Sequence, residues 1–250
     1  MQANKRLLER CFWGARDQEQ FLAEIVTLID AQLPSQNIFA GDNMVVFGRN
    51  QHFMDDAAFM ESFSSVISAD NYVGRAIMWR IHVYCWAAKQ GLRRQGDFVE
   101  CGVASGALSA IACAYLGFGS AAKRFHLIDA WDTDARVDAS VYQGNSLAYA
   151  RSVFSKYQNV RLVPGFIPDV FETAVMPERI AFLHLDLNSA AAEIAALEFL
   201  FDRMTPGAVL LLDDFGHSGF RETQIAQIEW FNRRGLSVVE LPTGQGMVVA

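Results

Sequence analysis

Three aspartates stand directly after two strongly apolar runs in the C-terminal half of the chain. Asp186 ends the run Phe-Leu-His-Leu-Asp, and Asp213 and Asp214 end the run Val-Leu-Leu-Leu-Asp-Asp. If these runs are neighbouring parallel strands, the three carboxylates converge and repel one another unless a cation neutralises them. Mg²⁺ prefers oxygen ligands, keeps several waters and can hold substrate oxygens. The pattern therefore predicts a Mg²⁺ site, with helix caps or turn formers as the alternative for Asp213 and Asp214.

A glycine-bearing turn follows the first apolar run of the same region. The segment Glu-Cys-Gly-Val-Ala-Ser-Gly at residues 100–106 leads into an alanine-rich helical stretch, and glycines let a ligand approach the backbone closely. A dinucleotide fingerprint carries three glycines that seat a pyrophosphate, but Ala104 takes the place of the middle one. A carboxylate at the strand end repels pyrophosphate and suits a ligand that carries an ammonium group and hydroxyls, such as S-adenosylmethionine. The residues expected to contact this cofactor are Glu100, Gly102, Val103, Ser105 and Gly106, unless the segment is only a tight strand-to-helix turn.

The next two strand ends offer further cofactor contacts. Asp129 ends the run His-Leu-Ile-Asp, where an acidic side chain can accept hydrogen bonds from both ribose hydroxyls. Trp131 is then placed to stack on the adenine. Alternatively, Asp129 caps a turn and Trp131 belongs to the packed core. Gly165 and Phe166 form a turn after the third run, where backbone groups and an aromatic wall could contact the adenine edge.

A proton acceptor is needed if the substrate is a hydroxyl that is scarcely ionised at neutral pH. Asp186 and His217 are the candidate catalytic residues, and His217 lies in a glycine-flanked loop just after the aspartate pair. The alternative for His217 is a solvent-facing loop histidine. His126 and His184 lie within apolar runs, which favours a packed or hydrogen-bonded role in the core.

Seven short β-rich runs in residues 91–250 have to position these groups. Helical patterns separate the first five, which indicates βαβ crossovers and a mainly parallel sheet covered on both faces. Only residues 243–245 separate the last two runs, so these must form an antiparallel hairpin. The expected fold class is α/β, a doubly wound seven-stranded, mainly parallel sheet with a C-terminal antiparallel hairpin. Ligands of such a sheet bind at the carboxyl ends of its strands.

Residues 1–90 are expected to form a helical N-terminal segment ahead of the ligand-binding domain at 91–250. Apolar spacing predicts two amphipathic helices in residues 1–34, loop or strand fragments at 35–58, and a buried helix at 72–89. The segment at 35–58 could be a mobile cover. If the N-terminal part forms a lid, the residues placed to meet an acceptor substrate are His52, Asp55, Asp56 and Tyr72.

Composition narrows the partners and the compartment. The chain has 250 residues and a formal net charge of -7, so electrostatic attraction to nucleic acid or to anionic membranes is not expected. Its four cysteines lack the spacing of metal or redox sites and predict buried thiols in a reducing compartment. The N-terminus lacks the pattern of a signal peptide, and no apolar stretch approaches the roughly 20 residues that a transmembrane helix needs. These features predict a cytoplasmic protein that acts on a small molecule.

The motifs resemble those of the macrocin-type (macrolide sugar) O-methyltransferases, within the class I S-adenosylmethionine-dependent methyltransferases. The resemblance spans about residues 70–250 and rests on the Glu-Cys-Gly-Val turn, the His-Leu-Asp segment and the Asp-Asp pair. It implies an O-methyltransferase acting on a sugar or glycosylated natural product, with N-terminal segments closing over the site. It also implies Mg²⁺ ligands at Asp186, Asp213 and Asp214, and a cofactor surrounded by Glu100, Gly102, Gly106 and Asp129. Where such proteins tend to carry D-x-D-x-Y-E, residues 186–191 read Asp-Leu-Asn-Ser-Ala-Ala.

Two other classes of protein share such a sheet. A non-catalytic homologue that binds S-adenosylmethionine, or a metal-independent methyltransferase, would fit the missing D-x-Y-E residues. An NAD-dependent oxidoreductase fits less well, because the central glycine of its fingerprint is absent. Exposed apolar positions on the N-terminal helices also predict a possible homo-oligomer.

Overall fold

The computed structural model describes residues 4–34, 36–134, 136 and 146–250. The chain forms two compact units, Met1–Val83 and Tyr84–Ala250. The boundary expected after residue 90 falls within helix α4 (Met78–Gly91), which contributes residues to both units.

The C-terminal unit contains a seven-stranded sheet in the order β6-β5-β4-β7-β8-β10-β9. Its strands are β4 (Asp97–Cys101), β5 (Phe125–Asp129), β6 (Val160–Pro164), β7 (Ile180–Leu185), β8 (Met204–Leu212), β9 (Val239–Glu240) and β10 (Gly246–Val249). The first five are parallel, whereas β10 pairs antiparallel with both β8 and β9. The expected fold class, including the terminal hairpin, is confirmed. The strand order reverses between β4 and β7, which is where ligands bind in sheets of this kind.

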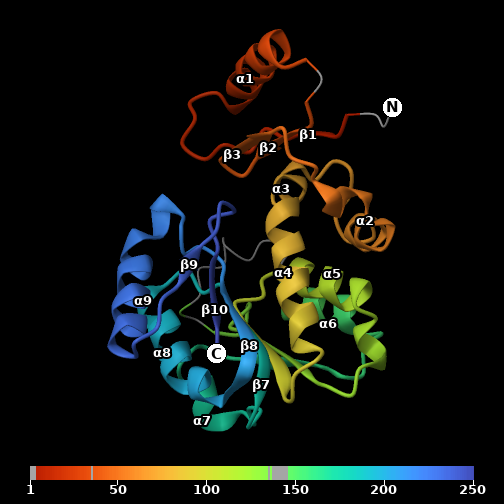
Figure 1. Ribbon diagram of the computed structural model, residues 1–250. Helices are drawn as coiled ribbons and strands as arrows, with labels where there is room; N and C mark the ends of the chain where they lie inside the picture. The colour runs from red at the N-terminus through yellow and green to blue at the C-terminus, as the bar shows by residue number, and fades with distance from the viewer. Residues whose placement is uncertain (1–3, 35, 135, 137–145) are drawn as a thin grey trace. The chain divides into compact units, whose positions relative to one another are not determined.

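Helices cover both faces of this sheet, with α8 and α9 on one side and α5 and α6 on the other (Figure 1). Their bounds are α5 (Ala107–Tyr115), α6 (Leu147–Phe154), α7 (Val170–Thr173), α8 (Ala190–Leu200) and α9 (Arg221–Arg233), with short 3₁₀ turns η2 (Phe118–Ser120), η3 (Phe201–Arg203) and η4 (Ser218–Phe220). Because both faces are covered, the central strands are apolar at nearly every position, and all six residues of β7 are buried. Trp230 and Phe231 of α9 pack with Leu183 and Leu210 in one core. Phe98, Phe125 and Phe182 form an aromatic cluster on the opposite face.

The N-terminal unit is only partly helical. Its elements are β1 (Arg6–Leu8), α1 (Gln18–Gln32), β2 (Ile38–Gly41), β3 (Met44–Phe47), η1 (His52–Asp55), α2 (Ala57–Ser64) and α3 (Tyr72–Ala76). Of the two helices predicted in residues 1–34, the first is wrong, because residues 6–8 pair in parallel with β2. Long-range pairing overrides the local apolar spacing there. The predicted helix over residues 72–89 is present but is divided between α3 and α4 at Ile77.

Two compositional expectations can be compared with the structure. All four cysteines are buried and free, as the sequence predicts. Among the helices in the described ranges, none is both long and apolar enough to span a membrane.

Candidate active site

A cavity of about 180 Å³ lies at the carboxyl ends of the strands on both sides of the order reversal. It brings together Gly102, Asp129, Gly165, Phe166 and Asp186, five of the residues singled out from the sequence. Sites that hold drug-sized ligands typically exceed about 300 Å³. The described walls therefore enclose part of the volume that a ligand of that size needs.

Gly102 allows the ends of β4 and β7 to meet at the floor of this cavity. Its φ is +85°, and a Cβ atom placed on it would lie 1.8 Å from the backbone oxygen of Asp186. The amide N–H of Asp186 donates to the carbonyl oxygen of Cys101 at 2.8 Å. This glycine is thus required by a backbone-to-backbone approach, whether or not a ligand is bound.

The other residues of the predicted cofactor turn differ in position. Val103 is buried, Ser105 is partly exposed, and Gly106 caps α5 in a left-handed conformation. A Cβ on Gly106 would lie 2.6 Å from the Phe154 ring. Packing against α6 therefore accounts for this second glycine.

Asp129 holds the loop that follows β4. Its Oδ2 accepts hydrogen bonds from the amide N–H groups of Val103 and Ala104 at 2.7 and 2.8 Å, and its Oδ1 accepts one from Trp131 at 2.7 Å. Its side chain also lines the cavity, so the contact predicted with the ribose stays a proposal. Trp131 is fully buried, and its Nε1 donates to the carbonyl oxygen of Ala104. Adenine stacking on Trp131 does not fit this placement, whereas the packed-core alternative does.

Glu100 lies beneath the cavity in a buried polar cluster. Its carboxylate accepts hydrogen bonds from Tyr84 at 2.8 Å and from Ser109, and its Oε1 lies 3.2 Å from His184 Nδ1. These contacts, rather than an exposed position for ligand, account for the carboxylate at the strand end. Burial alone would lower the pKa of His184, but hydrogen bonding to Asp213 and Glu100 outweighs it and raises that pKa to about 10.

Asp213 belongs to the same cluster and not to an open group of carboxylates. Gln245 Nε2 donates to its Oδ1 at 3.0 Å, and His184 Nε2 lies 3.5 Å from the same oxygen. Asp186 lines the cavity, while Asp214 is partly exposed in the loop after β8. Within the described ranges, no group of three or more His, Cys, Asp or Glu side chains is arranged to hold a metal ion. The residues as placed do not fit the predicted Mg²⁺ site, because nitrogen donors take up the Asp213 carboxylate.

His217 contacts the C-terminal hairpin. A Cβ on Gly244 would lie 2.6 Å from His217 Nε2, so the imidazole packs directly against that turn. The ring is partly buried, which differs from a freely solvated loop histidine.

Sequence reasoning missed His184 and Gln245 as partners of the predicted carboxylates. Glu100 and His184 are directly paired in the β4–β7 register. Each is a lone polar residue in an otherwise apolar strand, and this pattern could have indicated their contact. The register of β10 against β8, with Gly246 opposite Leu212, similarly brings Gln245 beside Asp213.

Glu193 is another residue that the sequence did not single out. It is buried in the first turn of α8, where it accepts hydrogen bonds from the Leu187 amide N–H at 2.9 Å and from Gln227 at 3.1 Å. Leu187 lines the cavity. Burial raises the pKa of Glu193 from 4.5 to about 7.

This shift predicts a pH dependence of stability. The folded protein retains the Glu193 proton to a higher pH than the unfolded chain does, so the associated stabilisation is complete below pH 4.5 and is lost as pH rises to about 7. Between these limits, the free energy of unfolding of the wild type should fall relative to that of Glu193→Gln by roughly 3 kcal/mol. Urea titrations at three pH values measure the difference, and parallel pH profiles of the two proteins would contradict it.

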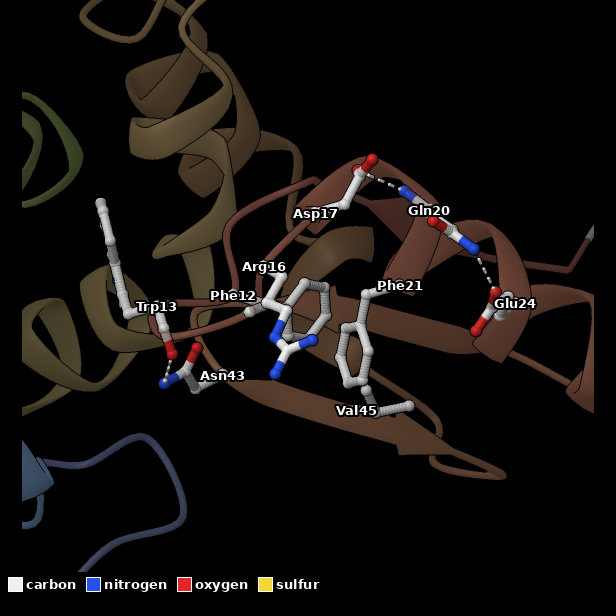
Figure 2. A pocket seen from close by; sticks show the side chains of 10 residues that line it. Phe12, Trp13, Arg16, Asp17, Gln20, Phe21, Glu24, Asn43 and Val45 are labelled. Carbon is white, nitrogen blue, oxygen red and sulfur yellow. Dashed lines mark hydrogen bonds between the residues drawn. The ribbon is translucent and has the colours of Figure 1, made fainter.

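A second, larger cavity of about 590 Å³ lies within the N-terminal unit. Figure 2 shows the Phe12 and Phe21 rings close together with the Arg16 guanidinium beside them. The sequence did not single out these residues. Phe21 and Leu28 of α1 are exposed, and the predicted homo-oligomer stays a prediction.

The N-terminal residues that were predicted to meet a substrate have local partners instead. Asp55 pairs with Lys5, Asp56 caps α2, and Arg10 lies over the Tyr72 ring. His52 Nδ1 lies 3.7 Å from Asp55. Contact of these side chains with a substrate is not tested by their placement.

The family described as methyltransferase domain matches residues 99–215. Together with the order and direction of its strands, this match makes the C-terminal unit a class I methyltransferase domain. A similar curated protein is mycinamicin III 3''-O-methyltransferase of Micromonospora griseorubida, which is 31% identical over 137 residues. That alignment covers 52% of this chain and 52% of the relative, so the chain spans about half the length of the curated protein it matches.

Two solved structures share the fold. The O-methyltransferase NovP aligns with a TM-score of 0.58 and 18% identity over 70% of this chain and 81% of its own. CalS11, a TDP-rhamnose 3'-O-methyltransferase of calicheamicin biosynthesis, aligns with a TM-score of 0.57 and 16% identity over 95% and 97%. The resemblance drawn from the sequence motifs is confirmed. The dinucleotide-dependent oxidoreductase has no support in these matches.

Proposed function

We propose that this protein transfers a methyl group from S-adenosylmethionine to a hydroxyl of a sugar or a glycosylated natural product. The observation that carries the proposal is the cavity at the ends of β4, β5, β6 and β7 in a methyltransferase domain. Gly102, Asp129, Gly165 and Phe166 are proposed to contact the cofactor there. The acceptor class is inferred from the relatives named as mycinamicin and TDP-rhamnose O-methyltransferases.

The reaction needs positioning more than covalent chemistry. The sulfonium is an activated methyl donor, so alignment of the acceptor oxygen for in-line displacement supplies most of the rate. Asp186 is proposed to accept the hydroxyl proton, since it lines the cavity at the β7 end. His217, which packs against Gly244, is the second candidate.

Metal assistance belongs to a separate arm of the test. The Asp213 carboxylate already contacts Gln245 and His184, so no step of this mechanism is assigned to Mg²⁺. A dependence of methyl transfer on Mg²⁺ would require these contacts to rearrange.

Calorimetric titration with S-adenosylhomocysteine, with and without Mg²⁺ and with NAD as a control, tests the cofactor. Methyl transfer from labelled S-adenosylmethionine to nucleotide sugars and glycosylated natural products then tests the acceptor. Asp186→Asn should lower turnover by at least about 100-fold while S-adenosylhomocysteine still binds. Absence of binding, or binding of NAD instead, would overturn the proposed function.

A further inference from the structure

We infer that His184 is a positioning residue that couples the cofactor cavity to the loop carrying Asp214 and His217. The inference rests on the proposed function, because it assigns the cavity to the cofactor and the loop to the acceptor. His184 is fully buried at the centre of β7, between the carboxylates of Glu100 on one side and Asp213 on the other. The edge of the Tyr84 ring packs against its imidazole, with centroids 4.8 Å apart.

On the cofactor side, His184 fixes the relative position of two strand ends. It pairs with Glu100 in the β4–β7 register and lies 3.2 Å from that carboxylate. Two residues further along each strand come Gly102 and Asp186, whose backbones touch at the cavity floor. A shift of β7 against β4 would therefore move both the Glu100 contact and the cavity walls.

On the other side, the connection continues into the C-terminal hairpin. His184 Nε2 lies 3.5 Å from Asp213 Oδ1, and the fully buried Gln245 donates to that same oxygen at 3.0 Å. The carbonyl oxygen of the adjacent Gly244 accepts a hydrogen bond from the Gly216 N–H at 2.6 Å, and the His217 ring packs on Gly244. The loop after β8 is thus attached to the same turn that holds Asp213.

Stability alone is a poor explanation for such a cluster. Burying ionisable groups costs desolvation, and well-packed apolar residues in their place are often equally or more stabilising. Every other residue of β7 is apolar, so an apolar side chain at position 184 would continue the core. What the imidazole adds is a directional contact on each of its two nitrogens, which specifies the spacing of β4, β7 and β8.

Hydrogen exchange of the wild-type protein tests the coupling without a substitution. Addition of S-adenosylhomocysteine should slow amide exchange at least threefold in peptides covering residues 214–217 and 243–246. Both segments lie outside the described lining of the cofactor cavity. If the ligand binds and exchange in these segments is unchanged, the coupling is wrong, whereas absence of binding overturns the proposed function as well.

A double-mutant cycle then assigns the coupling to His184. Gln245→Leu should weaken S-adenosylhomocysteine binding at least fivefold in the wild-type background, but less than twofold when His184→Phe is already present. Asn159→Leu is the matched control, because its amide also donates to three carbonyl oxygens in a part-buried site. That control should lower the melting temperature and leave the affinity within twofold. Equal effects of Gln245→Leu in both backgrounds would remove His184 from the connection.

Discussion

Gly102→Ala is expected to unfold the C-terminal domain or to abolish its cofactor binding. The added Cβ would lie 1.8 Å from the backbone oxygen of Asp186, at a residue whose φ is +85°. Backbone atoms on paired strands have no flexible side chain to move aside, so β4 and β7 must separate. We expect a loss of at least about 4 kcal/mol in the free energy of unfolding, a size that is exceptional for one substitution.

The matched control is Gly235→Ala. Gly235 also has a positive φ, +70°, but a Cβ there would meet no atom within 4 Å. Its cost should be only the left-handed backbone conformation, about 1–2 kcal/mol. Urea unfolding of both variants separates the two contributions. Similar losses in the two variants would show that backbone conformation, and not the contact with Asp186, makes Gly102 necessary.

Asp129→Asn is expected to have the second largest effect. The carboxylate accepts hydrogen bonds from the backbone N–H groups of Val103, Ala104 and Trp131. An asparagine retains one acceptor oxygen and turns an NH₂ group toward a donor, which leaves at least one buried N–H unsatisfied. We expect a loss of about 2–4 kcal/mol in stability and, because Ala104 and Asp129 line the cavity, at least a tenfold loss of S-adenosylhomocysteine affinity.

Asp97→Asn provides the comparison for this variant. Asp97 begins β4, at the end opposite the cavity, and its Oδ1 accepts a single hydrogen bond from the Arg124 N–H. Its substitution should cost less than about 1.5 kcal/mol and leave cofactor affinity unchanged. Calorimetry and urea unfolding of both variants provide the measurements. If Asp129→Asn binds the cofactor as the wild type does, the loop after β4 does not depend on this carboxylate.

The strand ends were predictable to the extent that apolar runs define them. Asp129 and Asp186 end or directly follow strands that sequence patterns located, and parallel strands place their carboxyl ends at one edge. The terminal hairpin followed from a connection of three residues, too short for a crossover. Residues 6–8 were mispredicted as helical because their partner strand is about 30 positions away and local spacing does not contain it.

The direction of each side chain was not predictable in the same way. Asp213 and Asp214 are adjacent in sequence, yet one is buried against His184 and Gln245 while the other is partly exposed. A change of one residue along a strand reverses the face that a side chain occupies. Three aspartates at neighbouring strand ends therefore predict proximity, but they do not predict a shared ligand.

Local pattern thus established the parallel sheet, its hairpin, the glycine turn after β4 and the carboxylates at the strand ends, because each depends on residues close together in the chain. Tertiary contacts alone revealed why Gly102 must be a glycine, that Trp131 is core, and that Glu100 and Asp213 share His184. Those facts depend on register and on side-chain direction between β4, β7, β8 and β10. Strand pairing creates these relations between residues that are 29 to 84 positions apart in the sequence.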